Sequence, residues 1–313
     1  TEEATMTEET RLGTKNRWLI PILGDPFRAR TLIVAINDAG GDPLNFGAWK
    51  SEWRCGSDTA VVAVHFPGHT SRAHERPCAS LAEASTGIIE ALMQLPCLDP
   101  SGTESHSPKQ AVRVQPPQEQ QYVMFGQCIG AYYCLRVAEE IRRRKLRQPL
   151  ALFMSSCPGP TDMHVLTRYT DGDEPEREAA RRALLSQAER DALLQQGLHD
   201  LTLAIGFSED DWQRVVASPT MYKAVVNDVR MTDLSHGVTR GDAPLPVAIV
   251  CLLGCDDPVV APHHLSSWLQ ATSRQLIVDM LPNLGHNIQY EPATVRSVQR
   301  HLDFVLAQHN QAQ

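Results

Sequence analysis

Hydrophobic positions along the chain fall into short unbroken runs, separated by longer stretches in which apolar and polar residues mix. Six of these runs are rich in β-branched or aromatic residues and lack polar alternation, which is typical of parallel strands covered on both faces. The predicted strands are Thr31–Ile36, Thr59–Phe66, Gln121–Gly126, Leu150–Ser155, Val247–Leu253 and Gln275–Leu281. Helical patterns separate most of them, so the sequence predicts a mostly parallel, doubly wound α/β sheet.

The stretches between the strands carry helical periodicity. Ala79–Leu95, Ala261–Thr272 and Pro292–Gln308 are predicted helices, the last with proline at its first position, where a missing N–H is tolerated. Another helix follows Gln121–Gly126. Its apolar stripe at three- and four-residue spacing is followed by cations that suit a helix C-terminus; the stripe comprises Cys134, Val137, Ala138 and Ile141, and the cations are Arg142, Arg143, Arg144 and Lys145.

Two stretches break this alternation. Residues 99–120 are polar and proline-rich, which predicts a flexible surface insertion, expected at the edge of the sheet away from any site. Thr161–Ala243 has little strand character and three helical patterns, over Glu174–Leu198, after Ser208 and after Ser218-Pro219. We interpret this second stretch as a helical lid inserted between strands; the alternative is a helical bundle packed elsewhere.

The length of 313 residues suits one large domain with such an insertion. The core is expected at 18–160 and 244–313, with the lid at 161–243. Residues 1–17 are polar and acidic, the reverse of a signal peptide, and are predicted to be a linker or a disordered segment. Apolar runs stay well below the length that crosses a membrane, so no membrane partner is expected.

Composition narrows the function further. The net charge of −8 argues against a nucleic-acid partner. Eight cysteines without paired spacing predict free thiols in a reducing, cytoplasmic compartment and no zinc site. His65, His69 and His74 surround Pro67-Gly68, but no carboxylate spacing supports a metal there.

The strongest chemical signal follows the predicted strand Gln121–Gly126. Cys128 lies between Gly126 and Gly130 at a strand-to-helix turn, the nucleophile elbow of α/β-hydrolases with cysteine in place of serine. Glycines are needed there because the turn is strained and the two backbones pass too closely for a Cβ. The helix N-terminus favours a thiolate at this position. The pattern is short, and a buried apolar cysteine is the alternative interpretation.

An acid and a histidine follow at the ends of later strands. Val247–Leu253 runs into Asp256 and Asp257, of which Asp257 has the favoured spacing and Asp256 is the alternative. The last predicted strand is followed by Gly285-His286. The order nucleophile, acid, histidine is that of α/β-hydrolases, so we predict the catalytic residues Cys128, Asp257 and His286.

Two backbone N–H groups should stabilise the oxyanion that such a nucleophile generates. One is predicted at Ile129, directly after the nucleophile. The other is expected in the glycine-containing loop after Thr31–Ile36. Ala39 is the first choice, with Asp38 or Gly40 as alternatives.

With these residues identified, the chain resembles the thioesterases of nonribosomal peptide and polyketide synthesis, especially their type II branch. The resemblance spans Trp18 to Phe304. Its motifs are Asp38 to Gly41 with Phe46 and Trp49, Phe66 to Gly68 with Arg72 and Glu75, Phe125 to Ala131, Ser155 to Pro158, Gly254 to Pro258 with Trp268 and Thr272, and Gly285-His286. The family implies an α/β-hydrolase fold, a helical lid and no bound cofactor. It also implies an acyl chain delivered on the 4′-phosphopantetheine arm of a carrier protein, expected upstream in the same synthetase.

Two features depart from that family. Gln127-Cys128 stands where His-Ser is usual, and the polar stretch 99–120 is longer than normal. Acyl transfer to serine would lose the activation of a thioester, whereas transfer to Cys128 keeps it. Ring closure needs that activation, and cysteine thioesterases of this family are associated with β-lactam and β-lactone release. The resemblance therefore points to cyclising release, as at the terminus of a monobactam (sulfazecin-type) synthetase.

Three other interpretations remain open at this point. The chain could be a type II editing thioesterase that hydrolyses misacylated carrier proteins. It could be a metabolic cysteine hydrolase of the dienelactone-hydrolase type. It could also be a non-catalytic interaction module in which Cys128 replaced a lost serine, although Asp257 and His286 argue against that.

Overall fold

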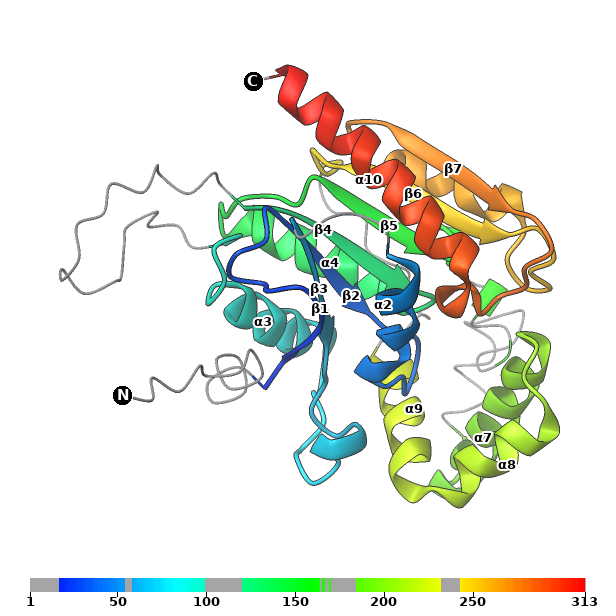
Figure 1. The fold of residues 1–313 in the computed structure, drawn as a ribbon. Helices are drawn as coiled ribbons and strands as arrows, with labels where there is room; N and C mark the ends of the chain where they lie inside the picture. The colour runs from blue at the N-terminus through cyan, green and yellow to red at the C-terminus, as the bar shows by residue number, and fades with distance from the viewer. Residues whose placement is uncertain are drawn as a thin grey trace, which may run out of the picture.

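A seven-stranded sheet forms the centre of the computed structural model, which describes residues 17–53, 58–98, 120–163, 165–166, 169, 184–231 and 243–312 (Figure 1). The strand order is β1-β3-β2-β4-β5-β6-β7. The strands are β1 (Leu19–Leu23), β2 (Thr31–Ile36), β3 (Thr59–Val64), β4 (Gln121–Gln127), β5 (Ala151–Ser155), β6 (Ala248–Gly254) and β7 (Leu276–Leu281). The sheet, with its flanking helices, confirms the predicted α/β-hydrolase architecture, and each predicted strand is present within two residues of its expected ends.

Strand β1 was not predicted. It pairs antiparallel with β3 at the edge of the sheet, whereas all other neighbouring strands are parallel. Pro21 lies inside it, and the register shifts between Pro21 and Leu23. Proline is tolerated in an edge strand because one side needs no ladder hydrogen bond. The run Leu19–Leu23 is apolar, but Pro21 at its centre argues against a strand in the sequence, and only Leu19 and Ile22 are buried.

The side chains of the central strands divide between two cores. In β2, Leu32, Val34 and Ile36 pack into one core, and Ile33 and Ala35 pack into the other. The first core lies under α3 (Leu81–Leu92), α4 (Gly130–Arg143) and the 3-10 helix η4 (Pro262–Gln270). The second lies under η1 (Pro43–Ala48), α2 (Trp49–Glu52) and α10 (Pro292–Ala312) (Figure 1).

The predicted helices of the core have identifiable ends. Ser80 caps α3, where its side chain accepts a hydrogen bond from the Glu83 N–H, and Pro292 begins α10 as expected. The predicted helix over Ala261–Thr272 is instead the 3-10 helix η4. Its first turn is tightened by His264, whose Nδ1 accepts a hydrogen bond from the Ala261 N–H at 2.9 Å.

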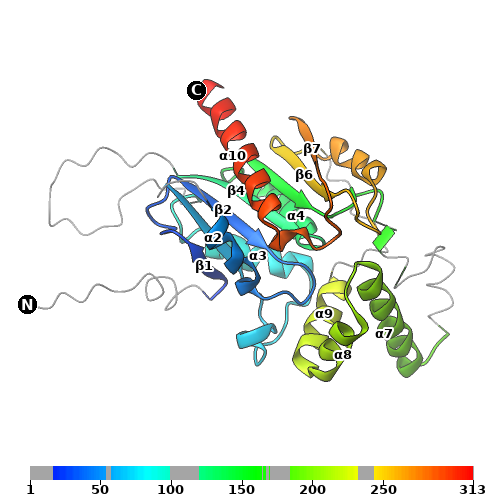
Figure 2. The same cartoon turned by 45° about the vertical axis from the view of Figure 1, so that its right-hand side comes forward.

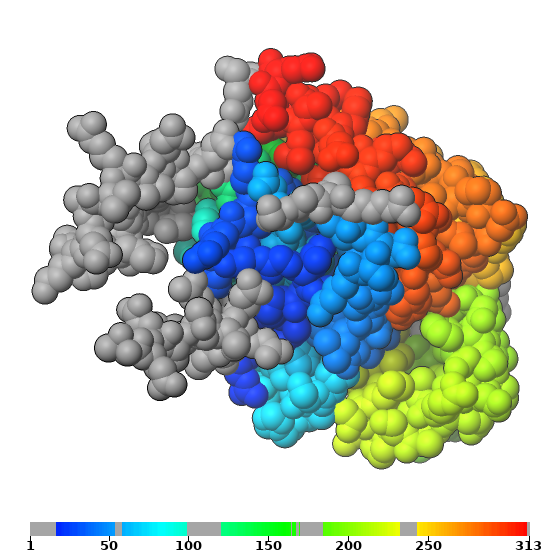
Figure 3. Space-filling model, viewed as in Figure 1, coloured from blue at the N-terminus to red at the C-terminus, as the bar shows by residue number. Residues whose placement is uncertain are grey.

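Three helices, α7 (Gln187–Ala204), α8 (Glu209–Ala217) and α9 (Pro219–Met231), form a group at one end of the sheet (Figure 1, Figure 2). Capping boxes at Ser186 and Ser208 begin the first two, so the predicted start at Ser208 is confirmed. The third begins at Pro219, also as predicted. In the space-filling view these helices lie against the segments that follow β2 and β3 (Figure 3). We call α7, α8 and α9 the lid helices.

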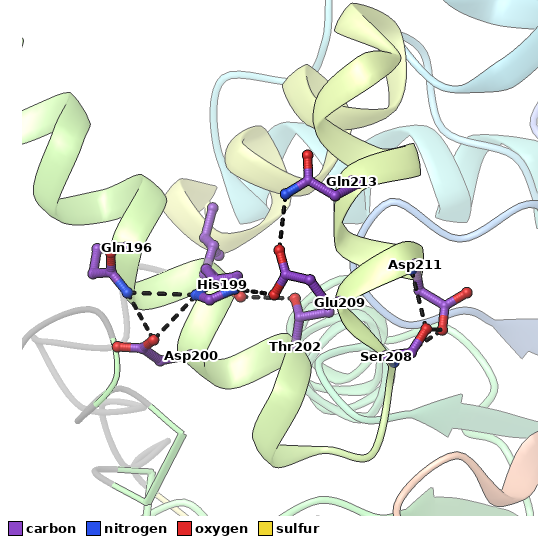
Figure 4. A network of polar contacts seen from close by, with 9 residues as sticks. Gln196, His199, Asp200, Thr202, Ser208, Glu209, Asp211 and Gln213 are labelled. Atoms are coloured by element: carbon purple, nitrogen blue, oxygen red, sulfur yellow. Dashed lines mark hydrogen bonds and ion pairs between the residues drawn. The ribbon is translucent and has the colours of Figure 1, made fainter.

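Contacts between side chains hold the lid helices together. Trp212 of α8 is buried and contacts the rings of His199 on α7 and Tyr222 on α9, at centroid distances of 5.5 and 6.3 Å. His199 also links α7 to the first turn of α8, where its Nε2 lies 2.8 Å from Glu209 Oε2 (Figure 4). Gln213 Nε2 donates to the other oxygen of Glu209. The three helices therefore form one packed unit.

Parts of the predicted organisation lie outside the described residues: residues 1–16 of the N-terminal segment, 99–119 of the insertion, and 170–183 within the predicted helix Glu174–Leu198. Gln120, expected at the end of the insertion, is buried. Its side chain donates to the carbonyl oxygens of Pro26 and Ala29 at 2.8 and 2.7 Å, which fixes the approach to β4. Every helix in the described ranges is too short or too polar to span a bilayer.

Candidate active site

The turn between β4 and α4 holds Cys128 in a strained conformation. Its φ is 50°, a left-handed value that residues other than glycine adopt rarely. The Cys128 N–H donates to the Ser155 carbonyl of neighbouring β5 at 2.8 Å, which anchors the turn to the sheet. The side chain is largely buried at the start of α4. The backbone thus presents the sulfur at the carboxyl edge of the sheet.

Glycines on both sides of Cys128 make this turn possible. A Cβ on Gly126 would lie 2.3 Å from the backbone of Gly130, and a Cβ on Gly130 would lie 2.5 Å from the carbonyl oxygens of Ile36 and Asn37. Real Cβ atoms do not approach backbone this closely, so neither position accepts a larger residue without moving the strand or the helix. The same contacts bring the start of α4 against the loop that follows β2.

An aspartate and a histidine from two other loops meet behind this turn. His286 Nδ1 lies 2.9 Å from Asp257 Oδ2, and both side chains are buried. The other oxygen of Asp257 accepts hydrogen bonds from the N–H groups of Val259 and Val260, both at 2.9 Å. These hydrogen bonds fix the orientation of the Asp257 carboxylate, with Oδ2 facing His286. Asp256, the alternative acid, is exposed to solvent, so Asp257 is the residue that the structure brings to the histidine.

The electrostatic environment of His286 favours the imidazolium. Burial lowers its pKa, but the charge of Cys128 and the hydrogen bond to Asp257 raise it, with a net rise to about 10. Its Nε2 is buried and has no hydrogen bond of normal geometry among the described residues. In unliganded enzymes such a bond is often long and tightens only with substrate. The nitrogen that would exchange a proton with the thiol is therefore kept away from other partners.

Gln127, treated above only as a departure from a family pattern, connects the elements of this site. It is fully buried, and its Nε2 donates to the His286 carbonyl at 2.9 Å while its Oε1 accepts from Ser155 Oγ at 2.6 Å. One side chain thus joins β4, β5 and the histidine loop. Its position next to the nucleophile was the only sign of this role in the sequence.

Of the two predicted oxyanion donors, Ile129 directly follows Cys128 in the turn before α4, and Ala39 lies in the loop after β2. Neither the Ile129 N–H nor the Ala39 N–H donates to another group within the described parts of the chain. Gly41 N–H donates to the Asp38 carbonyl at 3.1 Å, and Gly40 N–H donates to Asp228 Oδ2 at 2.8 Å. The amide of Gly40, an alternative donor in the sequence, is therefore engaged by a carboxylate of lid helix α9.

The same loop carries a second titratable group. Asp38 is half-buried, and burial raises its pKa to about 6, although the positive charge of His286 acts in the opposite direction. Its Oδ2 lies 3.5 Å from Gln289 Nε2, at the limit of a hydrogen bond. Sequence reasoning considered only the backbone of Asp38, because nothing in the pattern shows that its carboxyl group would be desolvated near the histidine.

Lid helices contact both sides of the site. On one side Asp228 of α9 reaches the loop after β2, as described above. On the other, Asn287, the residue after His286, donates through Nδ2 to the Ile205 carbonyl at the end of α7, at 3.1 Å. The lid helices therefore lie across the end of the sheet at which Cys128 and His286 meet (Figure 2).

The histidines near Pro67-Gly68 have other partners than a metal. His65 Nε2 lies 3.0 Å from Thr70 Oγ1, and His69 Nε2 lies 2.9 Å from Asp228 Oδ2. Within the described residues no group of histidine, cysteine and carboxylate side chains is arranged to hold a metal ion.

The cysteines of the described residues are all unpaired, and Cys255 is the exposed one. Cys134 is fully buried on the core face of α4, as expected from its place on the apolar stripe, and burial raises its pKa. Burial also raises the thiol pKa of Cys157 and Cys251, which keeps these groups protonated and inert.

Comparisons with known proteins agree with this architecture. The Alpha/beta hydrolase family matches residues 33–298. Among solved structures, the RedJ thioesterase from the prodiginine biosynthetic pathway in Streptomyces coelicolor superposes with a TM-score of 0.62 at 22% identity, covering 90% of this chain and 88% of that one. No curated protein sequence matches the chain.

Two further neighbours are type II thioesterases. BorB from the borrelidin biosynthetic cluster gives a TM-score of 0.59 at 20% identity, covering 91% of this chain and 96% of its own. YbtT from the yersiniabactin NRPS/PKS biosynthetic pathway gives a TM-score of 0.59 at 17% identity, covering 92% of this chain and 99% of its own. At these identities the likeness establishes the shared fold.

Proposed function

Because the chain belongs to the alpha/beta hydrolase family, we propose that it is a thioesterase that accepts an acyl or peptidyl chain on Cys128. The observation that carries this proposal is the elbow cysteine at φ 50° combined with the buried His286–Asp257 pair at 2.9 Å. Structural likeness to thioesterases of prodiginine, borrelidin and yersiniabactin biosynthesis supports the choice of a thioester as substrate. A carrier protein with a 4′-phosphopantetheine arm is the proposed donor.

Acylation follows from the proposed roles of the triad. The Cys128 sulfur attacks the thioester carbonyl, and its proton resides on His286 Nε2, where Asp257 stabilises the imidazolium. The tetrahedral intermediate collapses as the bond to the pantetheine sulfur breaks. His286 returns the proton to that sulfur, so a free pantetheine thiol leaves and an acyl-cysteine thioester remains.

The oxyanion of the tetrahedral intermediate is assigned to the N–H groups of Ile129 and Ala39. Both amides lack another acceptor among the described residues, and Ile129 lies at the N-terminus of α4, where the helix dipole adds to the stabilisation. One such donor contributes about 3 kcal/mol to the barrier in related chemistry.

Release from Cys128 is proposed to occur by attack of a nucleophile within the acyl chain. A thioester on cysteine retains the activation that a serine ester would lose, which favours closure of a strained β-lactam or β-lactone ring, as in a monobactam (sulfazecin-type) synthetase. His286 accepts the proton of the attacking N–H or O–H, and the lid helices limit the access of water. The cysteine thiol is then regenerated.

Hydrolysis is the second candidate. The structural neighbours BorB and YbtT are described as type II thioesterases, which favours an editing enzyme that clears carrier proteins with water as the nucleophile. The two candidates share acylation and differ only in the group that attacks the acyl-cysteine.

Intact-mass measurement after mixing with a peptidyl-pantetheine thioester tests both candidates. An acyl adduct on the wild type followed by cyclic product, with a stalled ester or linear acid from Cys128→Ser, would support cyclising release. An adduct followed only by linear acid would favour editing. The absence of any adduct, in a protein whose Cys128 still reacts with iodoacetamide, would contradict thioesterase activity on that class of substrate; Cys128→Ala is the blank.

A further inference from the structure

The Asp228 carboxylate of the lid helices contacts the loop 37–41, which carries the proposed oxyanion donor Ala39. Asp228 of α9 is buried, and its Oδ2 accepts hydrogen bonds from the Gly40 N–H at 2.8 Å and from His69 Nε2 at 2.9 Å. The first contact joins residues 188 positions apart in the sequence. Three parts of the chain therefore meet at one oxygen atom: the loop after β2, the loop after β3 and the lid.

The surroundings of His69, the partner of this carboxylate, favour its imidazolium form. His69 is buried, and both of its ring nitrogens face acceptors, Nε2 toward Asp228 and Nδ1 toward the Pro67 carbonyl at 3.3 Å. A ring that donates from both nitrogens must carry both protons. Burial lowers the pKa of His69, but its hydrogen bond to Asp228 and the charge of that carboxylate raise it overall. One buried carboxylate oxygen thus joins an imidazole and a backbone amide.

Packing places α9 directly over the same amide. Gly40 has a φ of 70°, and a Cβ there would lie 2.5 Å from Val225 Cγ2, one turn before Asp228 on α9. Only glycine fits between the loop and the lid helix. The loop and α9 therefore have complementary surfaces at the residue that follows Ala39.

We propose that Asp228 is a positioning residue of the oxyanion hole: by binding the Gly40 N–H it fixes the loop 37–41 so that the neighbouring Ala39 N–H points at the reacting carbonyl. This inference rests on the proposed function and adds that the oxyanion hole is complete only with α9 in place. A substrate that displaces α9 would meet an oxyanion hole in which the Ala39 N–H is misplaced. Return of α9 to the loop 37–41 would restore that donor. A misplacement of about 1 Å in such a group can lower the rate about 100-fold.

A purely structural role, in which Asp228 only docks the lid, predicts different behaviour. The chain offers a matched control in the preceding residue, because Asn227 also ties α9 to the core, donating through Nδ2 to the Cys78 carbonyl at 3.3 Å. Asn227→Ala loses a lid-to-core hydrogen bond without touching the loop 37–41. If docking alone matters, Asn227→Ala and Asp228→Ala should behave alike.

The test compares two reactions of the same thiol. Acylation of Cys128 by a peptidyl-pantetheine thioester passes through an oxyanion, whereas alkylation by iodoacetamide does not. We expect Asp228→Ala to slow acylation about 10- to 100-fold and to leave alkylation within about twofold of wild type. Asn227→Ala should change neither rate. Alkylation is read on the Cys128 peptide, because the exposed Cys255 also reacts.

Two further variants keep the test decisive. Asp228→Asn retains an oxygen that can accept from Gly40, so its acylation rate should recover to within a few-fold of wild type. Asp228→Ser is too short to reach that amide and replaces Asp228→Ala should the latter not fold. Equal losses of acylation in the Asp228 and Asn227 variants, or parallel losses of acylation and alkylation, would overturn the proposal.

Hydrogen exchange of the segment 37–41 separates this inference from the proposed function. Loss of amide protection there in Asp228→Ala, with protection retained in Asn227→Ala, supports the positioning role even if no thioester acylates the wild type, an outcome that would count against the thioesterase function alone. Unchanged protection in Asp228→Ala would overturn the positioning role, whatever the enzyme's substrate.

Discussion

Asp38 places a carboxyl group beside the amide that is proposed to bind the oxyanion. Burial raises its pKa to about 6, against the opposing effect of the His286 charge. An ionised carboxylate at this position would repel a developing oxyanion, so the neutral acid is the form compatible with that step. Keeping such a group half-buried costs stability at neutral pH, which is typical of functional sites.

Substitution of Asp38 should therefore stabilise the protein in a pH-dependent manner. The folded-state pKa of about 6 exceeds the reference value of 3.8, so the folded state binds more protons and stability falls as pH rises between these values. We expect Asp38→Asn to raise the free energy of unfolding at pH 7 by about 1–2 kcal/mol and much less at pH 4. Urea unfolding at both pH values measures this; an equal change at the two would contradict it.

Gln127 holds the backbone of the histidine through its hydrogen bond to the His286 carbonyl. Gln127→Met keeps the volume but leaves that carbonyl and Ser155 without their partner, so we expect a loss of about 2 kcal/mol in stability and a slower acylation of Cys128. Ser155→Ala is the matched control, because it removes only the hydrogen bond on the far side. Stopped-flow acylation rates that fall equally in both variants would argue against a special role of the His286 contact.

At the scale of elements, the joint between α7 and α8 is held by charged groups in solvent. The hydrogen bond to Glu209 raises the pKa of His199, with Asp200 adding a smaller contribution (Figure 4). The His199 side chain also contacts the ring of Trp212. Because its folded-state pKa is raised, the contribution of the imidazolium is complete below the ordinary histidine pKa and is lost as pH rises through the raised value.

The joint should consequently loosen at alkaline pH. We expect amide exchange in α8, corrected for the intrinsic rate, to be faster at pH 9 than at pH 6 in the wild type. In His199→Gln the corrected exchange should show no such difference, since the side chain no longer titrates. Hydrogen-exchange mass spectrometry of the peptide that covers Glu209–Ala217 provides the measurement. A persistent pH effect in the variant would assign it to another group.

For the molecule as a whole, two hydrogen bonds tie the lid helices to loops of the core near Cys128 and His286. Asp228 binds the loop after β2, and Asn287 binds the end of α7. Under the proposed function, two such hydrogen bonds would limit the access of water to an acyl-cysteine more than one would, and exclusion of water would favour cyclisation over hydrolysis. The ratio of cyclic to linear product would then depend on how the lid helices pack on the core.

Loss of the hydrogen bond between Asn287 and Ile205 should shift the ratio of cyclic to linear product. We expect Asn287→Ala to lower the ratio of cyclic to linear product several-fold while acylation continues, because the hydrogen bond to Ile205 is lost and water gains access. Liquid chromatography of the products measures the ratio. Gln308→Ala, which removes an exposed hydrogen bond to Gln275 at the far end of α10, should leave it unchanged. An unaltered ratio in Asn287→Ala would count against water exclusion by the lid.

Features encoded over short distances in the chain were predictable. The elbow around Cys128 was identified because its glycines are needed by contacts within the same strand–turn–helix unit and with the adjoining loop. Strands β2 to β6 were found because burial on both faces requires nearly unbroken apolar runs. Ser208 revealed a helix start because a capping box is complete within four residues.

Features that depend on tertiary packing were not predictable. Nothing near Asp228 in the sequence indicates that it meets Gly40 and His69, since those contacts arise only when α9 lies on the core. Strand β1 was missed because Pro21 at its centre argues against a strand, and proline is tolerated there only because β1 lies at the edge of the folded sheet. The raised pKa of Asp38 likewise depends on groups brought together by folding, His286 and Gln289 among them.

The glycines at 126 and 130 have a consequence for the evolution of this site. Contacts of these glycines and of the Cys128 backbone N–H, and not the Cys128 side chain, set the backbone of the turn, so exchange of sulfur for oxygen at position 128 leaves these contacts in place. Most serine codons differ from a cysteine codon by a single nucleotide. A lineage with this elbow can therefore move between oxygen and sulfur nucleophiles in one mutational step on an intact scaffold, and the chemistry of release can diverge faster than the fold.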